Sequence, residues 1–364
     1  MIYRAFFRLL ILLRVDAEVA HTAAAWALRI LTAPKPLLLV LHRLLAPRER
    51  SLQVHVMGLD FHSPLGCAAG VDKSATWFDP LHALGFGFVE VGSVTAEAQP
   101  GNPKPRVTRL PRDRALLNAM GFPNDGAARV AERLRKRRIA GAAIGVNVGK
   151  TRIVDLDDAV DDYRRAVRKL APVADYIVLN VSSPNTPGLS QLQSADRFAA
   201  LIRGCRDEAH DVRPDLPVLV KIGPDLGDAD LDAVADSTRE AGLAGIVAVN
   251  TTTDLSAARD SQDQIAPLRH RGGISGAPLQ PRALAVLERL YGRVGEDVAL
   301  VSVGGIETAE DAWERVLAGA SLVQAYTGFV YGGPLWPSRI DRGLARLLRD
   351  SEFASIEAAI GRRG

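Results

Sequence analysis

The sequence predicts an α/β fold, a (β/α)8 TIM barrel that follows an N-terminal helical extension. After residue 50, a short apolar run leads repeatedly into a polar or glycine-rich loop and then into a helix-compatible segment. Alternating strands and helices are typical of a parallel sheet, and eight such units close a barrel. The count of eight and the length of 364 residues favour the barrel over an open, doubly wound sheet.

The apolar runs mark the expected strands, which are buried and parallel. They cover residues 65–69, 88–91, 143–146, 176–179, 218–220, 246–249, 298–303 and 322–325. Helical signals cover residues 157–170, 195–209, 228–240, 281–291 and 308–318. Thr308 and Asp311 form a capping-box pattern at the start of the last helix.

Further segments decorate the barrel. Residues 54–56 and 59–61 flank a Met-Gly pair and predict a hairpin that closes the barrel bottom. The long connections 99–124 and 252–273 are typical of lids or binding loops. We divide the chain into a helical extension, a barrel and a tail, which span residues 1–50, 51–350 and 351–364.

Composition excludes several classes of protein. Hydrophobic residues make up 47% of the chain and charged residues 24%, which is normal for a globular protein. The net charge of +3 is too small to indicate nucleic acid as a partner. Two cysteines, Cys67 and Cys205, give neither a disulfide framework nor a metal-site spacing, so we expect no metal and a reducing compartment.

The first 45 residues combine apolar and basic side chains. Arg4, Arg8 and Arg14 accompany an apolar run, residues 9–13, that is far shorter than the roughly 20 residues of a spanning helix. A signal peptide also fits poorly, because the charged residues Arg14 and Asp16 follow the apolar run directly and no clear cleavage site of small residues is present. Two further apolar segments cover residues 23–31 and 37–45. Such a pattern indicates helices that lie in a membrane interface, and packing on the barrel is the alternative.

Polar residues follow several strands at the same barrel rim, where α/β proteins place their chemistry. The clearest case is YIVLNVSSPNTPGL (176–189), in which prolines stiffen the loop after a buried strand. Asn147, Asn180 and Asn250 offer amide donors and acceptors that suit a planar heterocycle. The alternative for each is an ordinary turn residue.

Lys221 ends the fifth strand and can supply a positive charge to a reduced, anionic cofactor ring. It can instead form a Schiff base, as in barrel aldolases, or a salt bridge at the barrel mouth. Gly304-Gly305 and Tyr326-Thr327-Gly328 follow strands seven and eight, where this fold usually binds phosphate, and residues 272–276 are a third candidate.

A substrate pocket is expected beside these groups. Lys73, with Asn118, Gly121 and Phe122, is a candidate to hold an acidic substrate. Ser183 is the candidate proton acceptor, although a serine needs a dry site or a water relay to act as a base. Cys67 lies within the first strand and is expected to be buried packing rather than a nucleophile.

These motifs together resemble those of dihydroorotate dehydrogenases, and specifically of the quinone-linked, membrane-associated class 2. The similarity covers nearly the whole chain, and NVSSPNTPGL (180–189) and GASLVQAYTGF (319–329) are its most specific parts. The other matching stretches are AAGVDKS (68–74), EVGSVTAEAQPGNPKPRV (90–107), NAMGFPN (118–124), GVNVGKT (145–151), VKIGPDL (220–226), VNTTTD (249–254), GGISGAPL (272–279) and VGGI (303–306).

The resemblance implies an FMN-dependent oxidation of dihydroorotate to orotate in pyrimidine biosynthesis, with a membrane quinone as electron acceptor. It implies Ser183 as the base, and His21 and Arg106 near the quinone entrance between the N-terminal helices. The implied cofactor contacts are Ala69, Gly70, Val71, Asp72, Lys73, Ser93, Asn147, Asn180, Lys221, Val249, Gly276, Gly305, Tyr326 and Thr327. The implied substrate contacts are Lys73, Asn118, Ala119, Met120, Gly121, Phe122, Asn180, Asn185, Asn250 and Thr251.

Three departures from the family pattern remove no essential group. Ser93 and Val249 stand where threonine is common, and Ala119 replaces a common arginine. Rival functions are a Schiff-base lyase that uses Lys221 and a membrane-surface binder of a phosphate ligand. We expect peripheral association with the cytoplasmic side of a bacterial plasma membrane, because a transit peptide with a spanning helix is not seen. The sequence leaves the oligomeric state open, and a monomer is compatible with it.

Overall fold

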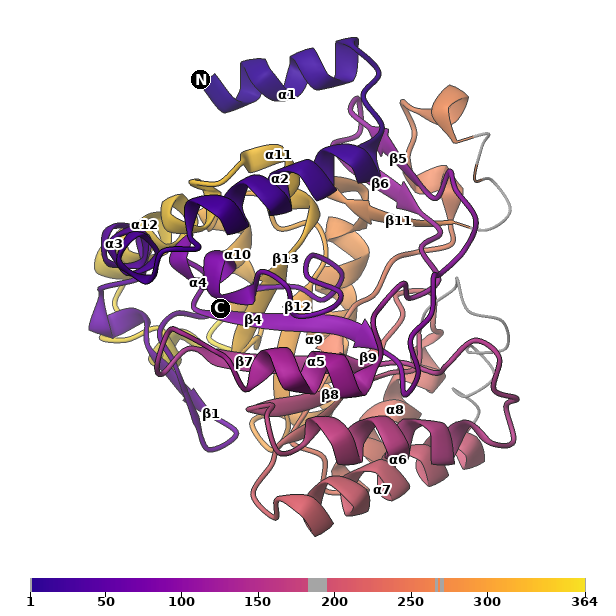
Figure 1. The fold of residues 1–364 in the computed structure, drawn as a ribbon. Helices are drawn as coiled ribbons and strands as arrows, with labels where there is room; N and C mark the ends of the chain where they lie inside the picture. The colour runs from indigo at the N-terminus through magenta and orange to yellow at the C-terminus, as the bar shows by residue number, and fades with distance from the viewer. Residues whose placement is uncertain (1, 183–194, 266–267, 269–271, 364) are drawn as a thin grey trace.

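The computed structural model describes residues 2–182, 195–265, 268 and 272–363 (Figure 1). Within these residues, eight parallel strands close into a barrel, so the predicted barrel is confirmed and the open sheet is excluded. In chain order the strands are β3 (Leu65–Cys67), β4 (Phe88–Val94), β7 (Ala143–Val148), β8 (Tyr176–Asn180), β9 (Val218–Ile222), β10 (Gly245–Ala248), β12 (Ala299–Val303) and β13 (Leu322–Ala325). Each strand pairs with the next, and β13 pairs with β3, with Val323 opposite Leu65.

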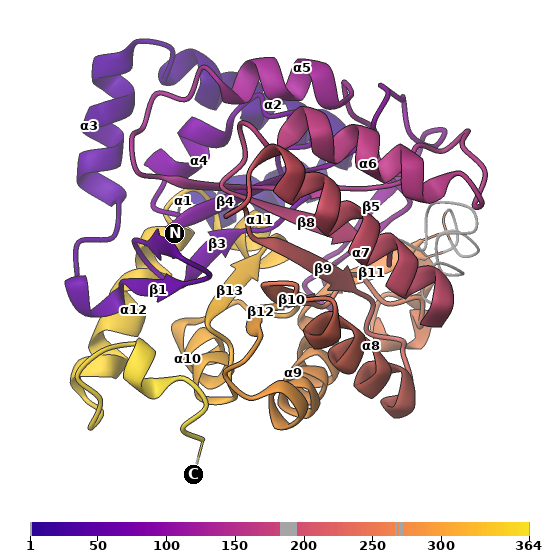
Figure 2. The same cartoon turned by 90° about the horizontal axis from the view of Figure 1, so that it is seen from below.

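Helices surround the strands, as the view from below shows (Figure 2). They are α4 (Phe78–Ala83), α5 (Ala127–Leu134), α6 (Ala159–Leu170), α7 (Ala195–Val212), α8 (Asp228–Glu240), α9 (Gln280–Val294), α10 (Ala309–Leu317), α11 (Thr327–Gly332) and α12 (Trp336–Arg349). The predicted capping box is confirmed, because Thr308 and Asp311 satisfy each other's backbone N–H groups at the start of α10.

The predicted hairpin is confirmed and closes the N-terminal end of the barrel. Strands β1 (Val54–Val56) and β2 (Leu59–Phe61) are antiparallel, and positive φ angles of 57° at Met57 and 71° at Gly58 form the turn between them. Phe61 packs edge-on against Phe88, the first residue of β4, with ring centroids 5.2 Å apart. This end is therefore sealed by apolar packing, and the opposite rim carries the polar groups.

A second, smaller sheet lies at the polar rim, within connections that the sequence predicted as loops. Strands β5 (Val107–Leu110) and β6 (Ala115–Asn118) form a hairpin, and β11 (Gly273–Gly276) pairs with β6 antiparallel. A separate apolar cluster that includes Leu110, Leu117 and Ile274 stabilises this sheet. The long connections after β4 and β10 thus join into one structured cover over the barrel mouth.

Three N-terminal helices pack on the barrel as α1 (Ile2–Leu12), α2 (Ala17–Leu31) and α3 (Lys35–Leu45). The Asp16 carboxylate caps α2 by accepting from the N–H groups of Glu18 and Val19 at 2.9 and 3.0 Å. Leu38 of α3 is fully buried in a cluster with Ala83 of α4. Among the described helices, none alone has the length and apolar character to cross a membrane, whereas α2 and α3 together meet that test despite a 107° bend between them.

The C-terminal tail packs on the start of the barrel domain. Ile356 is fully buried, and its N–H donates to the carbonyl of Ser51 at 2.8 Å. A short 3-10 turn, η7 (Glu357–Ala359), follows it, and Glu357 accepts from the N–H of His55 at 2.7 Å.

A buried carboxyl on α12 makes stability depend on pH. Ser63 donates to Asp341 Oδ1 at 2.6 Å, and burial raises the pKa of Asp341 to about 8. The unfolded chain releases this proton near pH 4, so through this group stability falls by about 1.4 kcal/mol per pH unit between the two pKa values.

Asp341→Asn keeps the acceptor for Ser63 and removes the titration. We expect the melting temperature of the variant to rise relative to wild type as the pH increases from 5 to 8. Thermal unfolding of both proteins at these two pH values measures this. A difference in melting temperature that is the same at pH 5 and pH 8 would contradict the role of Asp341.

Candidate active site

Side chains from neighbouring strands meet at the polar rim because parallel strands end at the same edge. Asn180 is the last residue of β8, and Lys221 stands opposite it in β9. Asn147 and Ser93 lie near the ends of β7 and β4. All four residues are at most 7% exposed, so the floor of the polar rim is buried.

A buried carboxylate fixes the orientation of the asparagines. Glu90 in β4 accepts from Asn147 Nδ2 at 2.9 Å and from Gln324 Nε2 at 2.7 Å. The amide oxygen of Asn147 then accepts from the hydroxyl of Ser93 and, at 3.2 Å, from Asn180 Nδ2. Because the carboxylate only accepts hydrogen bonds, it determines which way the amide of Asn147 points and hence the direction of the following bonds.

The same network continues to the loop after β8. The amide oxygen of Asn180 accepts from the N–H and hydroxyl of Ser182 at 3.2 and 3.3 Å. Asn250 Nδ2, beyond the end of β10, donates to Ser182 Oγ at 3.1 Å. Ser182 is therefore held between the ends of two barrel strands, β8 and β10.

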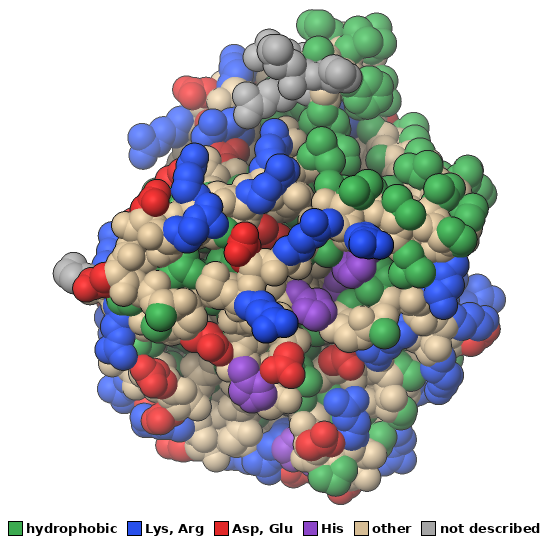
Figure 3. Space-filling view, turned by 90° about the vertical axis from the view of Figure 1, so that its left-hand side faces the viewer, with side chains coloured by type: hydrophobic (Ala, Val, Ile, Leu, Met, Phe, Trp, Pro, Cys, Tyr) green, Lys and Arg blue, Asp and Glu red, His purple; other side chains and the backbone are tan. Residues whose placement is uncertain are grey.

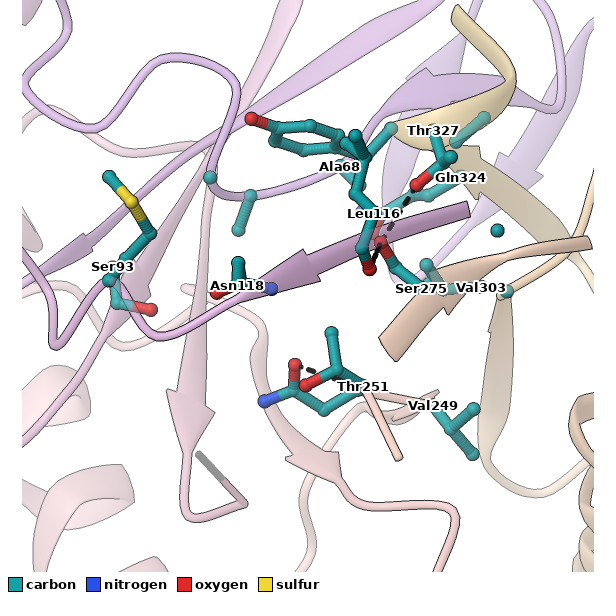
Figure 4. A pocket seen from close by; sticks show the side chains of 18 of the residues that line it. Ala68, Ser93, Leu116, Asn118, Val249, Thr251, Ser275, Val303, Gln324 and Thr327 are labelled. Atoms are coloured by element: carbon teal, nitrogen blue, oxygen red, sulfur yellow. Dashed lines mark hydrogen bonds between the residues drawn. The ribbon is translucent and has the colours of Figure 1, made fainter. Parts of the chain in front are cut away.

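A cavity opens above this floor and contains about 1130 Å³ of empty space, which includes the part open to solvent. It lies between the strand ends and the small sheet, from which Leu116, Asn118 and Ser275 face it (Figure 4). Its remaining described lining residues are Ala68, Ala69, Gly70, Lys73, Gly92, Ser93, Val107, Met120, Gly121, Phe122, Pro123, Asn180, Lys221, Val249, Asn250, Thr251, Gly276, Leu279, Val303, Gly304, Gly305, Ile306, Gln324, Ala325, Tyr326, Thr327 and Gly328.

Lys221 brings a cation to the cavity wall. Burial lowers the pKa of its ammonium, and the charge of Glu90 opposes this shift. Within the described part of the chain, the ammonium makes no hydrogen bond. The lysine is thus a buried hydrogen-bond donor that is available to a ligand.

Lys73 is a second cation, carried by the loop after β3. The buried carboxylate of Asp72 holds this loop by accepting from the N–H groups of Thr76 and Trp77, both at 2.8 Å. Lys73 Nζ donates to the carbonyl of Gly70 at 2.6 Å. Burial lowers the pKa of Lys73 to about 8, although nearby carboxylates oppose the shift, so most of the group is charged at pH 7.

The far end of the cavity is built from glycine-rich backbone. A Cβ at Gly305 would lie 2.5 Å from the Cα of Gln280, and one at Gly276 would lie 2.5 Å from the carbonyl oxygen of Arg114. Both residues also have positive φ angles, 79° and 105°, so a side chain is excluded both by this steric clash and by the backbone conformation. The Thr327 hydroxyl, at the start of α11, is 2.9 Å from that of Ser275 (Figure 4).

Helix α2 contacts the loops around the cavity through charged and aromatic groups. The Arg106 guanidinium donates to both carboxylate oxygens of Glu18, at 2.6 and 3.1 Å. The His21 ring meets Trp77 edge-on with centroids 5.4 Å apart. Burial, with a smaller effect of Lys73, lowers the pKa of His21 to about 4, so this ring is neutral at pH 7.

The cavity brings together most of the residues that the sequence singled out. Of the expected cofactor contacts, Val71, Asp72 and Asn147 lie outside the lining, as does Ala119 of the expected substrate contacts. His21 and Arg106 also lie outside it, on the side of α2. Ser183 and Asn185 fall outside the described residues, so the structure does not place them.

Sequence reasoning missed several groups that shape the site. Glu90 and Gln324 lie within runs that the sequence predicts as apolar strands, and Ser275 lies within a stretch that it predicts as a glycine-rich phosphate site. A charged or amide residue within an otherwise apolar strand was the signal available for the first two, because such a residue needs a buried partner.

Comparison with known proteins identifies the family. A sequence profile described as dihydroorotate dehydrogenase matches residues 51–348. A relative from Thermobifida fusca (strain YX), named dihydroorotate dehydrogenase (quinone), is 53% identical over 367 residues, which cover 99% of this chain and 96% of that protein. A protein of the same name from Rhodococcus opacus (strain B4) is 52% identical and covers 96% of this chain and 97% of its own length.

Solved structures agree with this assignment. A crystal structure of DHODH from Eimeria tenella in complex with ferulenol matches with a TM-score of 0.84 and 34% identity, over 96% of both chains. The ligand-free form matches with a TM-score of 0.85 and 33% identity, over 95% of this chain and 99% of that one. By sequence and by structure, the chain belongs to the dihydroorotate dehydrogenase family.

Proposed function

We propose that the protein oxidises dihydroorotate to orotate in pyrimidine biosynthesis, with FMN as cofactor and a membrane quinone as electron acceptor. The observation that carries the proposal is one cavity whose lining combines a buried lysine, several asparagine side chains and a glycine-rich end. Membership of the family and the names of the relatives support the same reaction.

The residues present fit FMN. The floor of Asn180, Ser93 and Lys221 would hold the polar edge of the flavin ring, and Gly276, Gly305 and Thr327 would hold its phosphate. Bound FMN supplies a hydride acceptor, and the Lys221 ammonium can balance the negative charge that reduction creates. Val249 and Val303 add apolar surface to the lining of the cavity.

The substrate would lie toward the small sheet and the loops after β3 and β10. Lys73 would pair with its carboxylate, and Asn118, Asn250 and Thr251 would hydrogen-bond its ring amides. Ser183 would take the proton from C5 of dihydroorotate. Its neighbour Ser182 is 8% exposed and hydrogen-bonded, which supports the dry setting that a serine base needs.

Colour tests this function directly. The purified protein should be yellow with the absorption spectrum of oxidised flavin, and dihydroorotate added without oxygen should bleach it. Adding a quinone should then restore the colour. A colourless protein to which FMN does not bind would contradict the proposal, and so would a flavin that dihydroorotate leaves oxidised.

The N-terminal helices would bring the quinone to the flavin. Glu18 and Arg106 join α2 to the loop after β4, and His21 packs against Trp77 beside the loop that carries Lys73. These contacts support a quinone site on this side of the barrel. In this proposal, residues 1–50 form the module through which the quinone enters, residues 51–350 form the catalytic barrel and residues 351–364 form a tail.

The surface of these helices supports peripheral contact with a membrane. Hydrophobic side chains gather at the top and along one side of the molecule in a space-filling view (Figure 3). The large exposed apolar residues of this region are Phe6, Leu9, Leu12, Leu13, Val19, Trp26, Ile30, Leu31, Leu37, Leu39, Val40 and Leu44. An apolar patch beside basic residues is typical of helices in a lipid interface.

A basic groove adjoins α2 and would face anionic headgroups. Arg29, Arg133, Lys136 and Arg138 line it, with Asp79 as the single carboxylate among its described lining residues. Attraction to anionic lipid adds to apolar insertion and weakens as salt screens it. We infer that the protein sits on the cytoplasmic face of the plasma membrane.

Vesicle binding measures this contact. Trp26 and Ile30 are 59% and 63% exposed on α2, so replacing both with serine should weaken binding to anionic vesicles about tenfold or more. Ile153, which is 88% exposed in the loop after β7, provides the matched control. Equal binding by the double variant and by Ile153→Ser would contradict a membrane role for α2.

A further inference from the structure

Arg315 on α10 is a fully buried cation that the proposed reaction does not use. Its exposed fraction is 0%, and within the described part of the chain it forms no salt bridge. Burial lowers the pKa of its guanidinium to about 10, so the group stays charged at neutral pH. A buried charge without a paired carboxylate is costly, which indicates a specific use for it.

The guanidinium lies behind the glycine-rich end of the cavity. One terminal nitrogen donates to the carbonyl oxygens of Gln280 at 2.8 Å and Gly304 at 3.1 Å. The other donates to the hydroxyl of Ser302, in β12, at 3.2 Å. Its Nε is buried without a partner among the described residues. The end of β12 and the start of α9 are thus tied to one side chain of α10.

The bond to Gly304 determines where the next N–H points. The peptide between Gly304 and Gly305 is not among the cis bonds of the chain, so its C=O and N–H point in opposite directions. Because Arg315 fixes the C=O on the α10 side, the N–H of Gly305 faces away from α10. Gly305 lines the cavity, and within the described residues its N–H has no hydrogen-bond partner.

We propose that Arg315 is a positioning residue that selects phosphorylated flavin, because it aims the Gly305 N–H at the phosphate and adds positive charge behind that peptide. This inference rests on the proposed FMN function. Donation to a carbonyl also polarises the N–H of the same peptide, so its bond to an anion is strengthened. Riboflavin, which lacks the phosphate, gains nothing from this arrangement.

The test compares affinities for FMN and riboflavin in the full-length chain freed of flavin, by quenching of flavin fluorescence. Arg315→Met should lower the preference for FMN over riboflavin about tenfold or more and leave riboflavin affinity nearly unchanged. Arg282→Met is the matched control, since Arg282 also donates to two backbone carbonyls, those of Pro224 and Leu226, on another part of the rim. It should keep the wild-type preference.

The outcomes separate the inference from the function on which it rests. If Arg315→Met weakens both flavins equally, or neither, the positioning role is wrong while flavin binding stands. If the wild-type chain binds neither flavin, the proposed function itself fails. Should Arg315→Met not fold, Arg315→Lys decides, because it keeps the charge and loses the forked geometry. Its preference for FMN should fall, and an unchanged preference overturns the inference.

Discussion

Replacing Ser183 with alanine is expected to slow the reduction of bound flavin by dihydroorotate about 10²- to 10⁴-fold, the usual contribution of a positioned general base. Flavin content should stay normal, because the described residues that are proposed to hold the cofactor are all retained. Stopped-flow absorbance at the flavin band without oxygen measures the rate. Ser183→Cys should recover part of it at high pH, where a thiolate can accept the proton.

Ser182→Ala provides the control for that experiment. Ser182 precedes the base and links Asn180 to Asn250 through its hydroxyl, so its loss should loosen the loop without removing the proton acceptor. We expect a smaller loss of rate than in Ser183→Ala. If Ser182→Ala is slow and Ser183→Ala is near normal, the assignment of the base to Ser183 is wrong.

Deleting residues 1–31 is expected to abolish reduction of quinone while dihydroorotate still reduces the flavin. The deletion removes α1 and α2, including Glu18 and His21, and retains α3, whose Leu38 is fully buried against α4. Arg106 loses its ion pair with Glu18 and Trp77 loses its ring contact with His21, whereas the floor of the cavity is untouched. Rates with a membrane quinone and with a small water-soluble acceptor separate the two half-reactions.

A shorter deletion of residues 1–15 separates the contribution of α1 to quinone reduction from that of α2. It removes α1 and leaves Asp16 to cap α2, so the contacts of Glu18 and His21 persist. Quinone reduction should therefore survive better than in the longer deletion. Full quinone activity after loss of residues 1–31 would place the quinone site elsewhere.

The barrel was predictable because its strands are buried on both faces and read as short apolar runs between helices. The small sheet was not. Strands β5, β6 and β11 are four residues long and contain polar positions such as Thr108 and Ser275. One partner of β6 is its hairpin neighbour β5, but the other, β11, lies about 155 residues away in the chain, so only tertiary pairing reveals that β11 is a strand.

The site was predictable where a polar residue interrupts or ends an apolar run, as at Asn147, Asn180 and Lys221. It was not predictable for a polar group that lies outside the cavity and acts through the backbone of a residue that lines it. Arg315 stands three residues after Ala312, on the buried face of α10, and a single arginine in a charged helix gives no sign of burial. Burial of such a group depends on the carbonyls of Gln280 in α9 and of Gly304 just after β12, which the sequence of α10 does not specify.

The pairing of β13 with β3 orders events during biosynthesis. The first and last strands of the barrel must hydrogen-bond to each other, so a nascent chain cannot seal the ring until its final strand has left the ribosome. Tyr326 and Thr327 follow that strand, so the cradle proposed for the phosphate is completed last. Helices α1 to α3 precede every barrel strand in the chain, so the surface proposed for lipid contact is synthesised before the catalytic chamber can close.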